Sequence, residues 1–325
     1  MILSLLLSSL LTFVELNCEN LFDTAHDSLK NDLEFTPDGS YRWTRTRYWR
    51  KLDSLAKEII ALGEPQDSAA SSRLAKAHAW QLPDLVALCE VENDSVMVAL
   101  TRRSLLRPAG YEYVMTDSPD ERGIDVALMY QPSSFRLLRT YPLSIPPKKG
   151  MRPTRDILYV CGQTADGDSL HVFVVHAPSR RGGEHASRPY RLHVARRLGE
   201  SVDSVQTVCP GARIIVAGDF NDYSDSPALL LLSSDHHLTE VSAGAKGYYG
   251  AKATYRWHGD WRSLDHIFCS RPLAARVQDC RIGDLPFLME EDAKYGGMKP
   301  FRTYLGPRYL GGFSDHLPLV LRLRL

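Results

Sequence analysis

The sequence of 325 residues has few cysteines and no excess of charge of either sign, and each shortage excludes a class of protein. The six cysteines occur without C-x-x-C spacing, which argues against a zinc site and against a disulfide scaffold. We therefore expect buried free thiols. Thirty-nine basic residues balance 39 acidic ones, so no global field draws the chain to duplex DNA or to an anionic membrane. Contacts with a polyanion are expected only at local patches.

Long apolar runs are also scarce, apart from the N-terminal stretch MILSLLLSSLLTFVEL. This stretch lacks the positively charged start of a secretory signal and the small residues before a cleavage point. It is also shorter than the roughly 20 apolar residues that a membrane span needs. Residues 1–12 are therefore either a degenerate signal or a hydrophobic lead-in to the first strand. The localisation, cytoplasmic or exported, stays open between these alternatives.

The chain shows no internal repeat and no change of composition that would mark a domain boundary, so we expect a single domain over residues 13–325. Short apolar runs that end in polar clusters predict strands at residues 13–16, 85–89, 125–130, 158–160, 170–175, 213–217, 263–269 and 317–323. Apolar spacing near three and four predicts helices at residues 44–62, 95–106, 188–205 and 227–232.

Two further stretches are interpreted as loops. The Ser-rich residues 67–73 predict a surface loop. Residues 283–312 are long and poor in regular signals, and loops of that length in compact domains usually serve a function. We expect this second stretch to form a lid or a wall of a substrate site.

Polar side chains follow the ends of several predicted strands. Asn17 and Glu19 follow the first strand, Glu90 follows the second, and His176 follows the strand at residues 170–175. Ligands of sheet proteins usually bind at such strand ends. Taken singly, an asparagine here is a strand-end cap, a glutamate is a solvated carboxylate, and a histidine is a packed side chain. Their combination favours a functional site.

The run IIVAGDFND, residues 214–222, shows the same change from an apolar strand to polar residues most clearly. It is apolar up to Gly218, and a carboxylate and an amide then follow at Asp219 and Asn221. A glycine allows the backbone to turn tightly, so the turn can aim both polar groups at one point. Asp265 in a later strand, and the SDH sequence of Asp315 and His316 before the last strand, extend the set.

The order of these motifs, LNCEN, LCEVEN, VVHAPS, AGDFND, SLDHI and FSDHLP, resembles the endonuclease/exonuclease/phosphatase superfamily, which has the deoxyribonuclease-I-like fold. The resemblance spans residues 13–323, and six short motifs in the right order are far more specific than any one of them. It implies an α/β (α+β) four-layer sandwich, with two mixed, mostly antiparallel sheets packed face to face and flanked by helices.

The resemblance also implies metal-assisted attack of water on a phosphate ester. A hard divalent cation offsets the charge that repels the nucleophile and the charge that builds on the leaving oxygen. Mg²⁺ suits carboxylate and amide oxygens, and we expect Mn²⁺ to substitute. The match to the family's glutamate makes Glu90 the first expected metal ligand, supported by Asn17, Glu19 and Asp315. Glu19 stands where the family usually has an aspartate.

The expected catalytic groups follow from the same match. Asp219 would hold or deprotonate the attacking water, and Asn221 would donate to a phosphoryl oxygen. His316 would contact the phosphate while Asp265 orients its ring. His176 matches a second histidine of phosphodiesterase members and would act on the leaving oxygen or the transition state. His266, next to Asp265, alternates to the opposite strand face and is expected to point away.

Basic residues near these motifs are candidates for binding the substrate phosphate, because a guanidinium matches phosphate geometry. They are Arg122, Arg180 and Arg188, each with a solvated surface position as the alternative. Arg45, Arg47, Arg50 and Lys51 are interpreted as the solvent side of an amphipathic helix. The neighbouring rings of Trp43, Tyr48 and Trp49 are expected in the core rather than as a platform for bases.

The expected activity is that of a phosphodiesterase of the nuclease type. A sphingomyelinase-like enzyme, an inositol phosphate phosphatase and a catalytically silent phosphate-binding or interaction module are the alternatives. The balanced charge argues mildly against duplex binding, and no apolar docking hairpin is evident beyond the N-terminal run. The partner is expected to be a phosphate-ester substrate such as a nucleic acid, bound by a monomer without an obligate protein partner.

Overall fold

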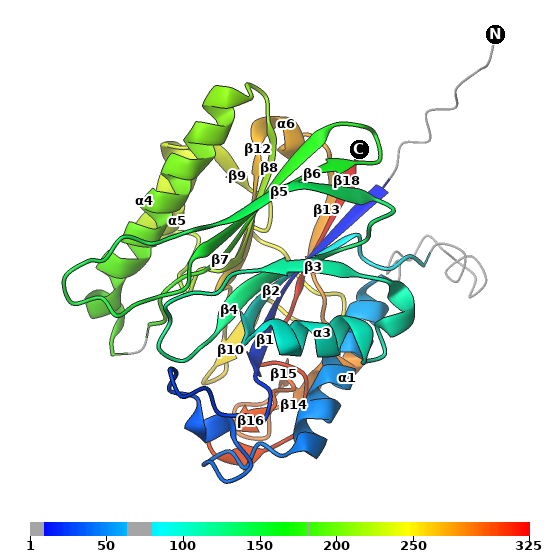
Figure 1. Ribbon diagram of the computed structural model, residues 1–325, viewed down its shortest axis with the longest axis vertical. Helices are drawn as coiled ribbons and strands as arrows, with labels where there is room; N and C mark the ends of the chain where they lie inside the picture. Colours follow the sequence, from blue (N-terminus) through cyan, green and yellow to red (C-terminus); the bar gives the residue numbers. More distant parts are fainter. Residues whose placement is uncertain (1–9, 64–79, 181) are drawn as a thin grey trace.

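The computed structural model describes residues 10–63, 80–180 and 182–325. Two six-stranded sheets form its centre (Figure 1). The first has the order β13-β18-β1-β2-β4-β3, built from β1 (Leu10–Leu21), β2 (Leu85–Val91), β3 (Glu112–Met115), β4 (Asp125–Tyr130), β13 (Val277–Ile282) and β18 (Leu319–Arg324). The second has the order β5-β6-β7-β8-β12-β9, built from β5 (Phe135–Leu143), β6 (Ile157–Thr164), β7 (Ser169–His176), β8 (Arg213–Asp219), β9 (Leu238–Glu240) and β12 (Asp265–Ser270).

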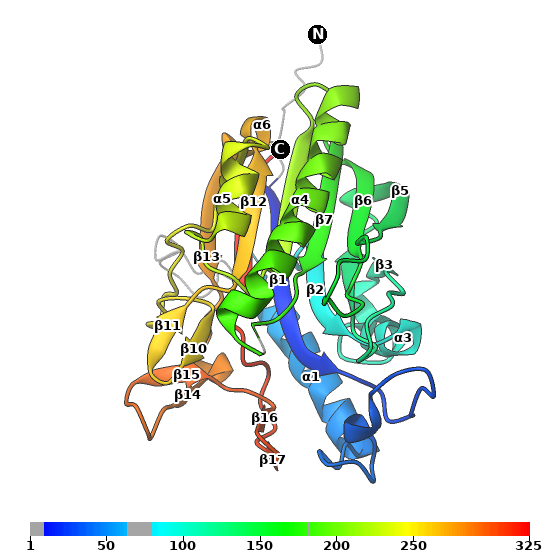
Figure 2. The ribbon, with the colours of Figure 1, turned by 90° about the vertical axis from the view of Figure 1, so that its left-hand side faces the viewer.

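Each sheet contains one parallel pair, β1 with β2 and β7 with β8, and its other pairs are antiparallel. Helices α1 (Arg45–Leu62) and α3 (Asp94–Arg102) cover the outside of the first sheet, and α4 (Glu184–Val208) and α5 (Pro227–Ser234) cover the outside of the second (Figures 1 and 2). The short α6 (Arg271–Ala274) follows β12. These four layers confirm the predicted fold.

The side chains of β7 show how the layers are held together. Val172 and Val174 enter the core between the two sheets, whereas Phe173 and Val175 pack into the core beneath α4 and α5. This alternation follows from the period of two in a strand. Because both faces are covered, a central strand such as β8 carries apolar residues on both faces, as in Ile214, Ile215 and Val216. Each fully buried large aliphatic or aromatic side chain contributes roughly 1.5–3 kcal/mol.

Side-chain caps begin three of the helices. Thr44 accepts from the N–H of Arg47, Asn93 from that of Val96, and Ser226 from that of Leu229. Such caps satisfy N–H groups that have no partner within the helix. The predicted boundaries hold within one residue for α1, and α5 begins at Pro227 as predicted but ends two residues later than predicted, at Ser234. The helix predicted at residues 95–106 ends at Arg102 and is followed by η2 (Arg107–Ala109), and the one predicted at 188–205 runs from Glu184 to Val208.

Three small hairpins lie at one end of the sandwich, in the lower part of Figure 2. They pair β10 (Tyr255–Trp257) with β11 (Asp260–Arg262), β14 (Met289–Glu291) with β15 (Met298–Pro300), and β16 (Tyr304–Leu305) with β17 (Arg308–Tyr309). Two hairpins and η3 (Pro286–Leu288) fall in residues 283–312, so the expectation of little regular structure there was wrong. Strands of two or three residues are too short to leave a periodic signal.

Some of the remaining expectations agree with the structure and others do not. All six cysteines are free, and four are buried, but Cys209 is exposed at the end of α4. Among the described helices, none combines the length and the apolar composition that a membrane crossing requires. The predicted loop at 67–73 and residues 1–9 of the N-terminal run lie outside the described residues, while residues 10–12 belong to β1.

Candidate active site

Backbone irregularities turn the ends of β1 and β2 toward the same place. The pairing of β1 with β2 shifts register between Asn17 and Leu21, and Glu19 and Asn20 have φ values of 47° and 59°. Opposite them, Glu90 has a φ of 62° where β2 shifts register against β4. Such bulges re-aim side chains, and left-handed backbone is uncommon in non-glycine residues. Asn17, Glu19 and Glu90 therefore lie within strands rather than beyond the strand ends predicted at residues 16 and 89.

In β8 a glycine serves the same purpose. Gly218 has a φ of 145°, and a Cβ atom there would lie 1.8 Å from the carbonyl oxygen of Val175 in β7. No other residue fits this close approach of two backbones. Asp219 follows at the end of β8, paired with Asp265 of β12 and with His176 of β7. Asp219 is thus the last residue of β8, two residues beyond the strand end predicted at residue 217, and Asn221 follows in the turn at the sheet edge.

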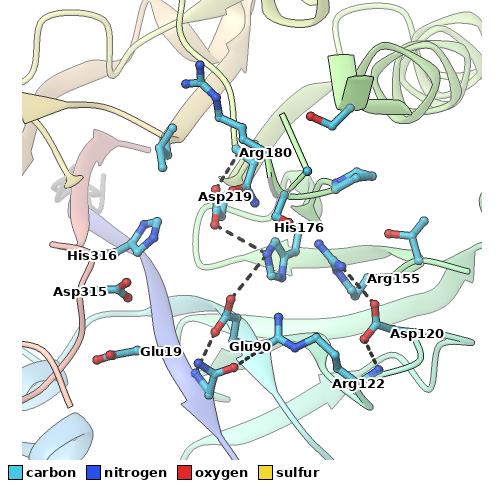
Figure 3. Close-up of a pocket in the computed structure, with 18 of the residues that line it drawn as sticks. Glu19, Glu90, Asp120, Arg122, Arg155, His176, Arg180, Asp219, Asp315 and His316 are labelled. Atoms are coloured by element: carbon cyan, nitrogen blue, oxygen red, sulfur yellow. Dashed lines mark hydrogen bonds and ion pairs between the residues drawn. The ribbon is translucent and has the colours of Figure 1, made fainter. Parts of the chain in front are cut away.

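A pocket of about 1390 Å³ opens where the loops of the two sheets meet. Nine of the predicted site residues line it: Glu19, Glu90, Arg122, His176, Arg180, Asp219, Asn221, Asp315 and His316. Figure 3 shows the side chains of Glu90 and His176 near its middle. Asn17 and Asp265 are buried behind this lining and bond to residues in it. Arg188 does not line the pocket. It lies in the second turn of α4 and pairs with Glu184 at 3.2 Å.

Two hydrogen bonds hold the carboxylate of Asp219. Its Oδ2 accepts a hydrogen bond from Asn17 Nδ2 at 3.1 Å, and its Oδ1 accepts from the backbone N–H of Asn221 at 2.8 Å. Burial raises the pKa of Asp219 to about 7, against the lowering effect of the His316 charge. A carboxylate with a pKa near neutrality can take up a proton and release it at that pH.

His316 and Asp265 form a buried pair. Both carboxylate oxygens of Asp265 lie within hydrogen-bond distance of His316 Nδ1, at 3.0 and 2.8 Å. Burial lowers the pKa of His316, but the charge and hydrogen bond of Asp265 outweigh it and raise that pKa well above the usual value. The imidazole is therefore held as a cation with Nδ1 bound to Asp265, which leaves Nε2 as a donor. Tyr255 packs its ring against His316 at a centroid distance of 4.9 Å.

His176 differs from His316 in charge. It is buried, and its Nε2 lies 3.6 Å from Asp219 Oδ2 and 3.8 Å from Glu90 Oε1. Burial and the nearby charges of Arg155 and Arg122 lower the pKa of His176 well below the usual value. The two histidines thus provide one neutral and one cationic ring within the same pocket. The position predicted for His266 is confirmed: it faces away and bonds to Glu240 and to the carbonyl of Asp222.

The acidic side chains offer oxygen donors suited to Mg²⁺ or Mn²⁺, and Glu90 fits best. Its Oε2 accepts from the backbone N–H of Asn20 at 2.8 Å, and its Oε1 lies 3.8 Å from His176 Nε2. Glu19 is more fully engaged, because its oxygens accept from the backbone N–H groups of Thr303 and Tyr304 at 2.5 and 3.3 Å. Burial and the charge of Asp315 raise the pKa of Glu19 to about 7, and a bound cation would favour its ionised form.

A second group of donors has metal-like spacing. Asp219, Asp265 and His316 each place one potential ligand atom within 4.8 Å of the others. Both oxygens of Asp265 already bond to His316, however, and the cationic ring of His316 would repel a metal ion. We therefore favour the Glu90 side of the pocket for the metal, and the Asp219 side for proton transfer.

Sequence reasoning missed two arginines of this site, Arg302 and Arg155. Arg302 forms ion pairs with both Asp315 and Glu19: its Nη2 lies 2.8 Å from Asp315 Oδ2, and its Nε lies 3.5 Å from Glu19 Oε1. Arg155 is buried beside His176, bonded to Asp120 and to the carbonyl of Ala177. Surface arginines are so common that neither carries a signal in the sequence.

The structure also corrects the interpretation of Lys51. It was interpreted as a solvent-facing helix residue, but it is 1% exposed and donates to Thr303 Oγ1 at 2.7 Å and to the carbonyl of Phe313. The segment near residue 303 covers this face of α1. Trp43 and Tyr48 are buried, as predicted. Arg122 and Arg180 reach the pocket, where Arg122 bonds to Asn20 and Arg180 pairs with Glu184.

Comparison with known proteins gives the same fold. The model of the endonuclease/exonuclease/phosphatase family matches residues 12–325. No curated protein matches the chain. An endonuclease/exonuclease/phosphatase family protein from Bacteroides thetaiotaomicron has a TM-score of 0.60 at 16% identity, over 97% of this chain and 95% of that one. A mannosyl-6-phosphatase from the same organism has a TM-score of 0.58 at 16% identity, over 96% of this chain and 98% of that one. Truncated TDP2 from Caenorhabditis elegans has a TM-score of 0.57 at 14% identity, over 97% of this chain and 98% of that one.

Proposed function

Because the chain belongs to the endonuclease/exonuclease/phosphatase family, we propose that it is a metal-dependent hydrolase of phosphate esters, and specifically a phosphodiesterase of the nuclease type. One observation carries the proposal. A carboxylate with a pKa near 7, Asp219, lies in the same pocket as an imidazolium, His316, and an accessible carboxylate, Glu90. These groups supply a base, a donor to developing negative charge and a metal ligand, which together suit hydrolysis at phosphorus.

Asp219 acts as the base. Its oxygens are oriented by Asn17 and by the backbone of Asn221, so it can hold a water molecule and accept its proton as the water attacks phosphorus. Asn221 Nδ2 gives one hydrogen bond to the carbonyl of Ala177 and has a second hydrogen for a phosphoryl oxygen. The amide side chain is thereby fixed before the substrate binds.

His316 stabilises the charge that builds on the phosphoryl oxygens. Asp265 holds its ring and keeps it protonated, so its Nε2–H is ready to donate without reorganisation. His176 is neutral, and it can accept or donate a hydrogen bond at the leaving oxygen. Arg122 and Arg155 add positive charge on the same side of the pocket, as Figure 3 shows.

Glu90 would be the principal protein ligand of Mg²⁺ or Mn²⁺, with Glu19 and Asp315 nearby. When bound, the cation supplies positive charge that offsets repulsion between the nucleophile and the phosphate and the charge on the leaving oxygen. A catalytically silent module would be expected to lack one or more of these groups, and Glu90, Asp219, Asn221, Asp265 and His316 are all present.

The test is hydrolysis of bis(p-nitrophenyl) phosphate, with the monoester p-nitrophenyl phosphate assayed in parallel. We expect turnover of the diester with Mg²⁺ or Mn²⁺, none with EDTA, and a loss of about a hundredfold or more in Asp219→Asn. Faster turnover of the monoester would replace the phosphodiesterase by a phosphatase. No turnover of either substrate with any divalent metal would refute the hydrolase.

A further inference from the structure

The β10–β11 hairpin carries aromatic side chains at the mouth of the pocket. Its strands are joined by a two-residue turn at His258 and Gly259, whose φ values of 51° and 89° fit the tight turns that join antiparallel strands. Tyr255 and Trp257 are two residues apart in β10, so their side chains share one face of the hairpin. Both line the pocket.

Trp257 is the pocket-lining end of a column of three rings, which we call the aromatic column: Trp257, His258 and Tyr295. Trp257 stacks on His258 at 4.5 Å and 12°, and His258 stacks on Tyr295 at 5.6 Å and 25°. Trp257 and Tyr295 nevertheless remain 55% and 42% exposed. Large aromatic surfaces left in water forgo the burial that would stabilise them, so an exposed stack at a pocket mouth indicates a binding surface.

The column is held in place from behind by Arg256. Its guanidinium pairs with Asp292 at 3.3 Å and donates to the carbonyls of Met298 and Gly296 at 2.8 and 2.7 Å. These contacts fasten the β10–β11 hairpin to the β14–β15 hairpin, which carries Tyr295 in its turn. The rings are therefore ordered before any ligand arrives, which reduces the entropy that binding must remove.

The aromatic column lies next to the proposed catalytic groups. Tyr255 packs on the ring of His316, and its backbone bridges to that residue. Trp257 follows on the same strand face, about 7 Å farther along, the length of two residues in a strand. A group stacked on Trp257 is thus adjacent to the group whose phosphate lies at His316.

Cations accompany the aromatic face. Arg262 is cross-strand partner to Tyr255, so it projects from the same face, and its guanidinium lies 5.4 Å from the ring of Tyr223. Arg180 lies over the same ring at 4.1 Å. Within the described part of the chain, Arg262 has no ion pair with a carboxylate, so its charge is available to a phosphate group.

We propose that the aromatic column binds a base of single-stranded nucleic acid next to the scissile phosphate, with Arg262 binding a neighbouring phosphate. The inference rests on the proposed phosphodiesterase function and names its substrate class. Alternating stacking surfaces and cations are the usual means of holding a single strand without regard to sequence. In a duplex the bases are stacked on one another and cannot reach Trp257. A lipid surface suits the rim less well, because Asp260 and Lys294 put charged groups beside the rings and His258 is itself a polar ring.

The test measures affinity rather than turnover. The full chain carrying Asp219→Asn, which blocks cleavage, is titrated against a short fluorescein-labelled oligothymidylate and against a duplex of the same length, and anisotropy is recorded. We expect the single strand to bind more tightly than the duplex. Adding Trp257→Ala should weaken single-strand binding roughly tenfold or more, while Trp257→Phe should retain most of it. Arg262→Ala should reduce the salt dependence of single-strand binding by the amount expected for the loss of about one phosphate contact.

Tyr249→Ala is the matched control, since Tyr249 is 53% exposed and does not line the pocket. It should bind the single strand like the parent, and thermal unfolding should show that every variant is folded. Equal binding by Trp257→Ala and the control overturns the proposal. So does binding to phosphatidylcholine–sphingomyelin vesicles that depends on Trp257 while oligonucleotide binding does not.

The two proposals fail separately. Wild-type hydrolysis of bis(p-nitrophenyl) phosphate combined with Trp257-independent oligonucleotide binding refutes the aromatic column alone. Trp257-dependent binding of the single strand by a chain that hydrolyses no phosphate ester refutes the enzyme and supports the column as a binding site.

Discussion

The two sheets deliver different chemistry to one pocket, and they do so by different means. The first sheet contributes Glu19 and Glu90 through bulges in β1 and β2, where non-glycine residues adopt left-handed backbone. The second contributes His176, Asp219 and Asp265 from the ends of β7 and β8 and the start of β12, with Gly218 allowing β8 to approach β7 closely. In the proposed mechanism, the first set would hold the cation, whereas the second would move a proton.

Two contacts join these sets across the sandwich. Asn17 of the first sheet bonds to Asp219 of the second, and His316, which precedes β18 of the first, bonds to Asp265 of the second. The catalytic geometry therefore depends on how the sheets pack, which is fixed by the shared apolar core between them. The separation into a metal side and a proton-transfer side can be broken by substitutions on each side in turn.

The largest effect is expected on the metal side. Glu90→Gln keeps the shape of the side chain and removes its charge, so we expect diester hydrolysis to fall about a thousandfold and Mn²⁺ affinity to fall with it. Higher metal concentration should restore part of the activity. Turnover and Mn²⁺ titration calorimetry measure the two quantities. Glu112→Gln, an exposed glutamate in β3 of the same sheet, is the control and should change neither. Unchanged metal affinity in Glu90→Gln would remove Glu90 from the ligand set.

The contact that joins the two sheets should come next. His316→Ala and Asp265→Ala should each lower turnover by about a hundredfold, and the double variant should be little worse than His316→Ala alone. The physical reason is that Asp265 acts through the ring that it holds. Metal affinity should stay close to that of the wild type, unlike in Glu90→Gln. If the two losses multiply in the double variant, the residues act independently.

The sequence carries a local signal for the site residues of the second sheet that it lacks for those of the first. A glycine before Asp219 is visible in the sequence, and its turn follows from the properties of glycine. The left-handed residues Glu19, Asn20 and Glu90 leave no such mark, because glutamate at a bulge looks like glutamate in any strand. The predicted strands therefore ended at residues 16 and 89, one residue before the site began.

Long-range contacts account for the other errors. Lys51 has the helical spacing of a solvent-facing residue, and only the return of the chain at Thr303 buries it. Arg302 and Arg155 owe their positions to the acids around them, while Arg188, predicted to bind phosphate, pairs with Glu184 on α4 outside the pocket lining. A single arginine in a sequence cannot distinguish these outcomes, since its partner lies elsewhere in the chain.

The smallest expected effect concerns a histidine of the second sheet that supports the fold rather than the chemistry. His266 is buried in β12, with Nδ1 2.8 Å from Glu240 Oε1 and Nε2 2.9 Å from the carbonyl of Asp222. Burial lowers its pKa, but the hydrogen bond and charge of Glu240 outweigh this and raise it above the usual value. The charged ring binds a proton more tightly in the folded chain than in the unfolded chain. Its contribution to stability is therefore complete below the unfolded pKa, near 6.5, and is lost as the pH rises through the higher folded pKa.

His266→Gln should remove this pH-dependent contribution, which we expect to be about 1–2 kcal/mol in the free energy of unfolding at low pH. Urea unfolding measured at a series of pH values from about 6 upward gives the comparison, because the wild-type and variant curves should converge as the pH rises. His185→Gln, an exposed histidine on α4, should run parallel to the wild type throughout. Because His266 faces away from the pocket, its replacement should leave diester turnover within a few-fold of the wild type, in contrast to His316→Ala. A difference in stability that grows with pH would mean that His266 is neutral in the folded protein.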